Sequence, residues 1–457
     1  MSKKLIALLI CFLLLLAAAL IPEKSSSVLA VVHQHKVWPG ESSETTGLAD
    51  DGTLSTNLPI FIIHSDGAQI PGANLSETED LYCDYSIVHN ANGVNRSDDA
   101  PVMSGRMAIA VRGNSSRHFD KKQYGVKCVD QQNQQEQVGL LDLPAQSHWV
   151  LNGSYIDHSM IRNYLMYNLC GEILDDYVPR CRLCEVMISD AQGNLHYEGV
   201  YTLIEKVCVD KRRLNLTPYD PKYQQTSFLV QMNSHIDRYR IEHLKPDDIS
   251  AYAYDLEYPN PEILTQDSLD YIKNQLLRFE KSLHDAYNTG NWAPLEKIID
   301  LDSFVDYYII NEFFQNYDAG MRSTYIYQDL GGKICIGPVW DFDGTFNNFD
   351  AIDMKDNLME MKSSLFYAFL TQDAHFNARC ASRYRELRRT YLSDDYLIDY
   401  IDDVSEYLGH SAMRNCDRWY HGQYDLYTED LEQMRSFVHK RGAWMDEHFI
   451  LNSTVIR

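Results

Sequence analysis

Positive charge is scarce in this sequence. Its 457 residues contain 41 Lys and Arg against 65 Asp and Glu, which gives a formal net charge of −24. An acidic surface repels phosphate backbones and anionic lipid, which disfavours nucleic acid and other polyanions as partners but leaves a metal-bridged anion open. A protein partner of such a chain is expected to be basic.

Cysteine motifs with the spacing of a zinc site are also lacking. Of the ten cysteines, Cys181 and Cys184 form one CxxC pair, and no second pair stands at a suitable distance. A disulfide or two buried thiols are the favoured interpretations of this pair, and zinc binding is the less favoured alternative. No internal repeat is present, and proline is absent from residues 365–450.

The amino terminus has the pattern of an export signal. Lys3 and Lys4 precede an apolar run over residues 5–21, and Pro22 follows it. This pattern predicts that residues 1–21 are a signal peptide or a single membrane anchor, which makes the chain extracellular or attached to the cell surface. Residues 22–57 are rich in Ser, Thr and Gly and predict a flexible tether.

The remaining chain, residues 58–450, reads as an α+β domain in two lobes. Apolar or alternating runs predict strands in the first part, and periodic apolar residues predict one helix among them. The strands are expected at residues 58–64, 107–116, 121–128, 148–155, 182–189 and 198–207, and the helix at 158–174. Residues 209–262 carry no clear pattern, whereas helices are expected at 266–288, 303–315 and over most of 365–450. The strand-rich lobe thus covers about 58–208 and the helical lobe about 209–450.

Residues 323–329 and 333–340, joined by Leu330, Gly331 and Gly332, predict a hairpin, and the segment "IGPVWDFDGTFNN" places two acids together at its exit. Asp341 and Asp343 alternate along an extended chain, so their carboxylates point to the same face. Two like charges held this way are either screened by water or bridged by a divalent cation. Asp318 stands on a loop before the same hairpin. A loop acid that takes a hydroxyl proton and a second acid that holds the metal are a known solution for phosphoryl transfer. The alternative is that Asp318 caps a turn.

A turn rich in hydrogen-bond donors follows an earlier strand. Arg112, Asn114, Ser115 and Ser116 could direct N–H groups at phosphate, with Lys121, Lys122 and Lys127 nearby. The alternative is a hairpin turn with a solvated basic face. Glu205 lies in an otherwise apolar strand, where a buried carboxylate needs a cation, and a lysine near the turn is the expected partner. A surface-facing position for Glu205 is the alternative.

Several of these segments, in order, resemble the motifs of one family. "RGNSS…KKQYGVK", "SMIRN", "YEGVYTLIEKVCVDKRRLNL", "GKICIGPVWDFDGTFNN" and "MRSFVHKRGAWMDEHF" are similar to those of the spore-coat protein H (CotH) kinase family. The resemblance covers about residues 58–450. It implies a divergent two-lobed protein-kinase fold and an atypical, secreted or spore-associated protein kinase.

Roles for individual residues follow from this resemblance. Asp318 corresponds to the catalytic-loop acid, Asp341 to the metal-binding acid and Asp343 to a second metal ligand. The turn of Arg112, Asn114, Ser115 and Ser116 corresponds to the one that covers the nucleotide, and Lys122 to the phosphate lysine, ahead of Lys121 and Lys127. Glu205 either pairs with that lysine or borders the adenine. Two positions depart from the family pattern: Ser323 stands where Asn is usual, and Cys335 where Trp is usual.

The favoured functional hypothesis is an exported Ser/Thr protein kinase that uses ATP with Mg²⁺ or Mn²⁺ and acts on a basic, Ser/Thr-rich protein. The alternative is a kinase-like surface or cell-wall interaction protein with weak or no turnover. Glycoside hydrolysis by the paired acids is a third hypothesis, and it requires carboxylates about 5–10 Å apart across a sugar.

Overall fold

The structure, a computed structural model, describes residues 46–74, 79–90, 93–233, 236, 238–244, 253–348, 359, 361 and 364–452. The predicted export segment, residues 1–21, lies outside this range, as does most of the predicted tether. Among the helices of the described residues, none has the length and apolar character needed to cross a membrane.

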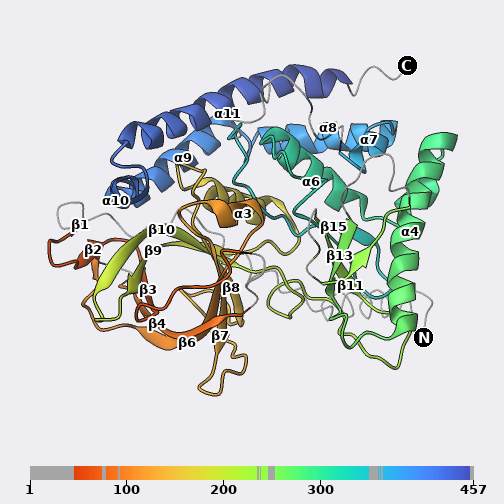
Figure 1. Cartoon of the computed structure of the whole chain (residues 1–457). Coiled ribbons are helices and arrows are strands. Elements are labelled where there is room, and N and C mark those ends of the chain that lie inside the picture. Colours follow the sequence, from red (N-terminus) through yellow and green to blue (C-terminus); the bar gives the residue numbers. More distant parts are fainter. Residues whose placement is uncertain are drawn as a thin grey trace, which may run out of the picture.

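A closed barrel of seven strands forms the strand-rich region (Figure 1). Its strands follow the order β10-β8-β7-β6-β4-β3-β9, and every neighbouring pair is antiparallel except β3 with β9. Alternate residues such as Phe61 and Ile63 on β3 and Met107 and Ile109 on β6 point inward and are fully buried. The strands are β3 (Ile60–His64), β4 (Leu81–Val88), β6 (Met103–Val111), β7 (Tyr124–Val129), β8 (His148–Asn152), β9 (Cys181–Ser189) and β10 (Leu195–Glu205).

The end of the predicted tether is part of the folded structure. Strands β1 (Gly47–Leu48) and β2 (Leu54–Thr56) form a small sheet with β5 (Asn95–Arg96). Leu54 is fully buried, and the Thr56 hydroxyl lies 3.2 Å from the Ser411 hydroxyl of the C-terminal region. The prediction of a flexible tether is therefore wrong for residues 47–57, since their short apolar residues pack against elements far along the chain.

A second sheet lies beside the barrel and has the order β12-β13-β11-β14-β15. The predicted hairpin is confirmed as β14 (Thr324–Gln328) paired with β15 (Ile334–Ile336). The other three strands lie within residues 209–262, where no clear pattern was found: β11 (Phe228–Asn233), β12 (Arg240–Ile241) and β13 (Ala253–Tyr258). Their partners lie up to a hundred residues away, as in the pairing of Phe228 with Gln328.

Helices make up most of the C-terminal region, as predicted. Side-chain caps begin several of them: Thr265, Asp300 and Ser393 each accept a hydrogen bond from a backbone N–H of the first turn. The helices are α3 (Arg162–Ile173), α4 (Gln266–Thr289), α5 (Ala293–Glu296), α6 (Leu301–Phe313), α7 (Tyr367–Leu370), α8 (Ala374–Arg388), α9 (Asp394–Leu408), α10 (His410–Trp419) and α11 (Tyr424–Asn452). The mixed α+β class, with strands first and helices later, is therefore confirmed, and the closure of the barrel is an addition.

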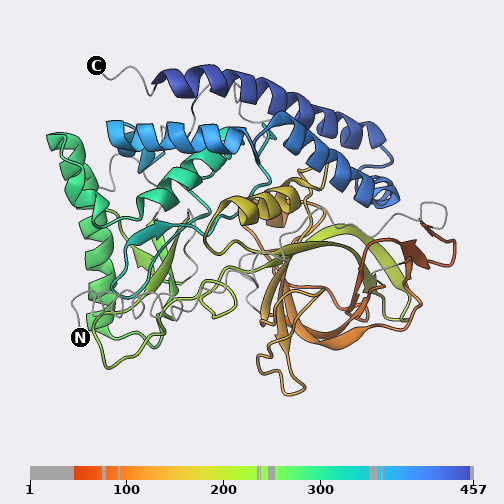
Figure 2. The same cartoon turned by 180° about the vertical axis from the view of Figure 1, so that it is seen from behind.

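Helix α3 lies between the barrel and the layer formed by α9 and α11, in both views of the molecule (Figures 1 and 2). Its first residue, Arg162, is fully buried. The guanidinium contacts Asp157 at 2.5 Å and Asp430 of α11 at 2.6 Å, and its Nε donates to the Thr345 carbonyl at 3.0 Å. One side chain thus joins α3, α11 and the loop that follows β15.

Replacement of Arg162 by Met should destabilise the fold strongly. Asp157 and Asp430 would remain with little compensation for their charges, which typically costs about 3–5 kcal/mol. Urea unfolding measures the loss. Arg435→Met on α11 is the matched control, because Arg435 pairs with Asp402 at the surface and such pairs contribute about 0–1 kcal/mol. Equal losses in the two variants would contradict the central role of Arg162.

Candidate functional site

Three predicted acids lie near one another around the β14–β15 hairpin. Asp318 belongs to the turn between α6 and β14, whereas Asp341 and Asp343 follow β15. The Ser323 hydroxyl, just before β14, donates a hydrogen bond to Asp341 Oδ2 at 3.0 Å. The charge of Asp341 acts on both other acids. The structure therefore brings together the acids before and after the hairpin that were predicted as site residues from the sequence.

The electrostatic environment disfavours charge on all three acids. Burial raises the pKa of Asp341, against a smaller lowering by the Ser323 hydrogen bond and the Arg112 guanidinium. Burial, and then the charges of Asp341 and Asp157, hold the pKa of Asp343 well above its usual range. Burial and the charge of Asp341 also raise the pKa of Asp318. The Arg322 guanidinium, 3.3 Å from the Asp318 carboxylate, lowers this pKa by a smaller amount. A cation among these carboxylates would relieve their repulsion.

Arg112 comes from the barrel and faces this acidic loop. It follows β6 and is half-buried, with its guanidinium carbon 5.8 Å from the centre of the Trp340 ring. Its Nη1 lies 3.4 Å from Gln123 Oε1, and its charge lowers the pKa of Asp341. Packing on Trp340 therefore positions a positive charge from the strand-rich region beside the acids of the helical region.

The turn after Arg112 has the compact geometry that the sequence predicts. Gly113 has φ +103°, and a Cβ there would lie 1.9 Å from the Ser116 hydroxyl, so a side chain at this position would clash. Ser115 begins a short 3₁₀ turn, η3 (Ser115–His118). Asn114 and Ser115 are exposed. The Arg117 side chain donates to the carbonyl of Val111 at 3.0 Å and also to that of Gly113, which fixes the turn against its own strand.

The three candidate lysines have other partners in this structure. Lys122 Nζ donates to the carbonyls of Arg117 at 2.9 Å and Phe119 at 2.6 Å. Lys121 is fully buried and donates to Val200 O and Asn415 Oδ1, and burial lowers its pKa to about 7. Lys127 pairs with Asp80 at 3.5 Å. A contact between Lys122 and phosphate stays a prediction, and it requires the ammonium to leave the carbonyls of its own turn.

Glu205 is buried at the end of β10, but its expected pairing with a lysine is wrong. Arg180 binds it through two hydrogen bonds, of 2.8 and 2.7 Å, and Tyr177 adds a third at 3.1 Å. Antiparallel pairing of β9 with β10 sets Cys181 opposite Ile204, which brings the preceding Arg180 to the carboxylate. The sequence showed that a cation was needed but not which strand supplied it. The proximity of Glu205 to adenine stays a prediction.

Two residues of α3 that were not predicted as site residues hold the acidic loop. Asn163 accepts the Phe342 N–H at 3.0 Å through Oδ1 and donates through Nδ2 to Asp343 Oδ1. One turn later, the Tyr167 hydroxyl accepts the Asp341 N–H at 3.2 Å. Both side chains are buried. Asn163 is the last residue of the "SMIRN" segment that resembles a family motif, and this is the hint that the sequence offers for it.

The backbone of the site is strained at two non-glycine residues. Ser323 has φ +47° and Asp341 has φ +67°, both in the left-handed region. Non-glycine residues rarely adopt this conformation, and asparagine tolerates it better than serine. Such strain gathers at functional sites because the surrounding structure has to maintain it.

The side chains at this site fit a hard divalent cation. Asp341, Asp343 and Ser323 offer carboxylate and hydroxyl oxygens, which are the ligand types that Mg²⁺ and Mn²⁺ prefer. Burial raises the pKa of both acids, and for Asp343 the charges of Asp341 and Asp157 raise it further, so a bound cation would favour their ionised forms. Asp341 and Asp343 would hold the cation, with Ser323 beside them.

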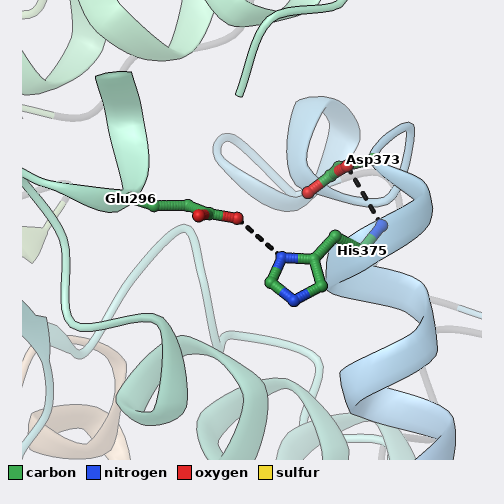
Figure 3. Close-up of side chains that lie close together, drawn as sticks. All are labelled: Glu296, Asp373 and His375. Atoms are coloured by element: carbon green, nitrogen blue, oxygen red, sulfur yellow. Dashed lines mark hydrogen bonds and ion pairs between the residues drawn. The ribbon is translucent and has the colours of Figure 1, made fainter. Parts of the chain in front are cut away.

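A second group of potential metal ligands lies apart from these acids. Ligand atoms of Glu296, Asp373 and His375 fall within 4.8 Å of one another, between α5 and the start of α8 (Figure 3). Asp373 caps α8 by accepting the N–H groups of His375 and Phe376, both at 3.1 Å, and His375 Nδ1 lies 2.6 Å from Glu296. A helix N-terminus carries partial positive charge, which disfavours a cation. Capping and a histidine–carboxylate contact therefore account for this group.

The cysteines of the described residues are free thiols. Cys181 and Cys184 are fully buried, which confirms the interpretation as two buried thiols over the disulfide and gives zinc no support. Burial raises the pKa of the Cys181 thiol to about 12, so it is protonated and unreactive. Cys335 is half-buried in the middle of β15.

Comparison with known proteins and protein families identifies the family of this chain. No curated protein matches the chain. The family model described as CotH kinase protein matches residues 109–445, a span that begins in β6, just before Arg112, and ends in α11. It includes Asp318, Asp341 and Asp343. The chain therefore belongs to the CotH kinase family.

Proposed function

We propose that this protein is an exported protein kinase that transfers the γ-phosphoryl group of ATP to Ser or Thr hydroxyls of another protein. In this proposal the barrel and the helical region act as the two lobes of a divergent kinase fold. The observation that carries it is the convergence of Asp318, Asp341 and Asp343 around one hairpin, with Arg112 facing them from the barrel. Membership of the CotH kinase family supports a kinase-like function.

Each residue has a distinct chemical task. Asp341 and Asp343 hold Mg²⁺ or Mn²⁺, which when bound neutralises charge on the phosphates. Asp318 orients the acceptor hydroxyl and takes its proton as the oxygen bonds to the γ-phosphorus, while the bond to the β-phosphate oxygen breaks and ADP leaves. Its raised pKa, caused by burial and the charge of Asp341, makes Asp318 a stronger base than an ordinary aspartate.

Nucleotide contacts come from the barrel side. Arg112 carries charge toward the phosphates, and the turn with Asn114, Ser115 and Ser116 offers exposed or half-buried donors close by. Lys122 joins them when its ammonium turns away from the Arg117 and Phe119 carbonyls. The net charge of −24 favours a basic, Ser/Thr-rich acceptor.

The competing proposal is a kinase-like surface interaction protein without turnover. Ser323 favours it, because a hydroxyl is a poorer metal ligand than the amide usual at this position, and here it hydrogen-bonds Asp341. Metal binding and phosphate transfer by the purified protein decide between the two.

Asp341→Asn should remove the cation response without harming the fold. One of the repelling charges is lost, so the metal-free variant should be as stable as the parent or slightly more so. The parent with ATP and Mn²⁺ at a hundred times their dissociation constant should gain about 2.7 kcal/mol, and the variant should gain none. Thermal unfolding with and without ligand measures this. A metal-free variant that unfolds, together with a parent that ignores Mn²⁺, would identify a structural hydrogen-bonding pair and end the kinase proposal.

Asp318→Asn should separate binding from transfer. The variant keeps Asp341 and Asp343, so its stabilisation by ATP and Mn²⁺ should equal that of the parent. Transfer of labelled γ-phosphate to a synthetic Lys- and Ser-rich peptide should fall by about 10²–10⁴-fold, because the group that accepts the proton is gone. Undiminished transfer in this variant would show that Asp318 only caps its turn.

Ser323→Asn should strengthen the cation site. Asparagine suits the left-handed backbone at this position and adds an amide oxygen beside Asp341. The Mn²⁺ concentration for half-maximal stabilisation should fall several-fold, whereas Ser323→Ala, the matched control, should raise it by removing the hydrogen bond to Asp341. Identical Mn²⁺ responses in the two variants would mean that residue 323 does not face the cation.

A further inference from the structure

We propose that Asn163 is a positioning residue for the metal-binding acids, with a neutral amide in place of a charged group because a charged one would compete with the cation. The inference rests on the proposed function, since it concerns how the chain presents Asp343 to a divalent cation. Asn163 is 1% exposed and belongs to α3, 180 residues before Asp343, the acid that it contacts.

The orientation of the Asn163 amide follows from its partners. The Phe342 N–H, 3.0 Å away, can only donate, so the atom that faces it has to be Oδ1. The NH₂ group is then on the other side, where it donates to Asp343 Oδ1. The two hydrogen bonds fix the peptide between the two acids and the rotation of the Asp343 carboxylate at the same time.

A neutral donor leaves the charge of the carboxylate available. Hydrogen bonds from Asn163 and Asn152 favour the ionised form of Asp343 without supplying a positive charge. An arginine at this position would satisfy the carboxylate as Arg180 satisfies Glu205, and a cation would have to displace it. The neighbouring Arg162 lowers the pKa of Asp343 through its charge, but its hydrogen bonds go to other partners, among them Asp157 and Asp430.

The rest of α3 makes this contact rigid. Arg162 anchors the start of the helix to α11 and to the Thr345 carbonyl, just beyond the acids. Tyr167 stands four residues after Asn163, on the same face of the helix, and its hydroxyl accepts the Asp341 N–H. Two consecutive peptides of the acidic loop are therefore held by one helix face, so the two carboxylates keep a fixed relation to each other.

The test compares two buried asparagines of the same helix. Asn163→Leu removes both contacts to the acidic loop. Asn168→Leu is the matched control, because Asn168 is 2% exposed and donates to the Tyr164 carbonyl at 2.8 Å, away from the acids. Free Mn²⁺ is measured by electron paramagnetic resonance during titration of each full-length protein in the presence of ATP, and urea unfolding without metal measures the fold.

Asn163→Leu should raise the half-saturating Mn²⁺ concentration by about 10–100-fold, the usual effect of losing a residue that orients a metal ligand. Asn168→Leu should leave it within about twofold, even where it lowers stability as much. Unchanged Mn²⁺ binding in Asn163→Leu, or equal weakening in both variants, would overturn the role of Asn163 while the proposed function stands. A parent protein that binds no Mn²⁺ with ATP would overturn the proposed function itself, and this role with it. If Asn163→Leu fails to fold, Asn163→Ala, which leaves room for water, is judged by the same thresholds.

Discussion

The buried contact of Arg162 with Asp157 and Asp430 is the interaction on which the rest of the site depends. It joins the start of α3, the long helix α11 and, through the Thr345 carbonyl, the loop that carries the acids. Because Arg162 and Asp157 are fully buried, these charges attract one another strongly, and removal of any one leaves the others uncompensated. Gln433 of α11 adds a further bond to the same loop, at the Phe346 carbonyl. The acidic loop is therefore fixed by elements that come before and after it in the sequence, and its own residues do not have to be good formers of a regular structure.

Charge is distributed unequally between this scaffold and the site. Elsewhere in the described interior, carboxylates lie against arginines: Glu205 with Arg180, Glu185 with Arg414 and Glu312 with Arg441. At the site Asp341 and Asp343 face mainly neutral donors and each other, with Arg112 at the edge, whereas Asp318 has Arg322 at 3.3 Å. Such an arrangement is costly without a cation and favourable with one. Asn163 belongs to this arrangement, because an amide orients a carboxylate and leaves its charge in place.

The predictions that succeeded depended on local patterns. Apolar periodicity predicted α3, α4 and α6, and the glycines between two alternating runs predicted the hairpin of β14 and β15. The acids at its exit could be identified because Asp341 and Asp343 are close in sequence.

The predictions that failed concern contacts between residues far apart in the sequence. Strand β11 pairs with β14 about a hundred residues later, and the barrel closes through a parallel contact of β3 with β9. The partner of Glu205, Arg180, directly precedes the neighbouring strand β9. Asn163 could not be assigned for the same reason, since its role exists only after α3 has packed against a loop far along the chain.

The convergence of carboxylates at the site fits the proposed phosphotransfer better than a purely structural use of the scaffold. Left-handed backbone at Ser323 costs on the order of 1–3 kcal/mol and less at Asp341, since aspartate tolerates it better, and the repulsion between half-buried acids adds to the cost. A protein that only displayed a binding surface would gain stability if these like charges moved apart. A phosphotransfer site does require them, because a cation and a hydroxyl have to be held at fixed places relative to the phosphate. The hydrogen bond of Ser323 to Asp341 is compatible with cation binding. The hydroxyl keeps the acid in position, and a cation that binds Asp341 only has to share one of its oxygens.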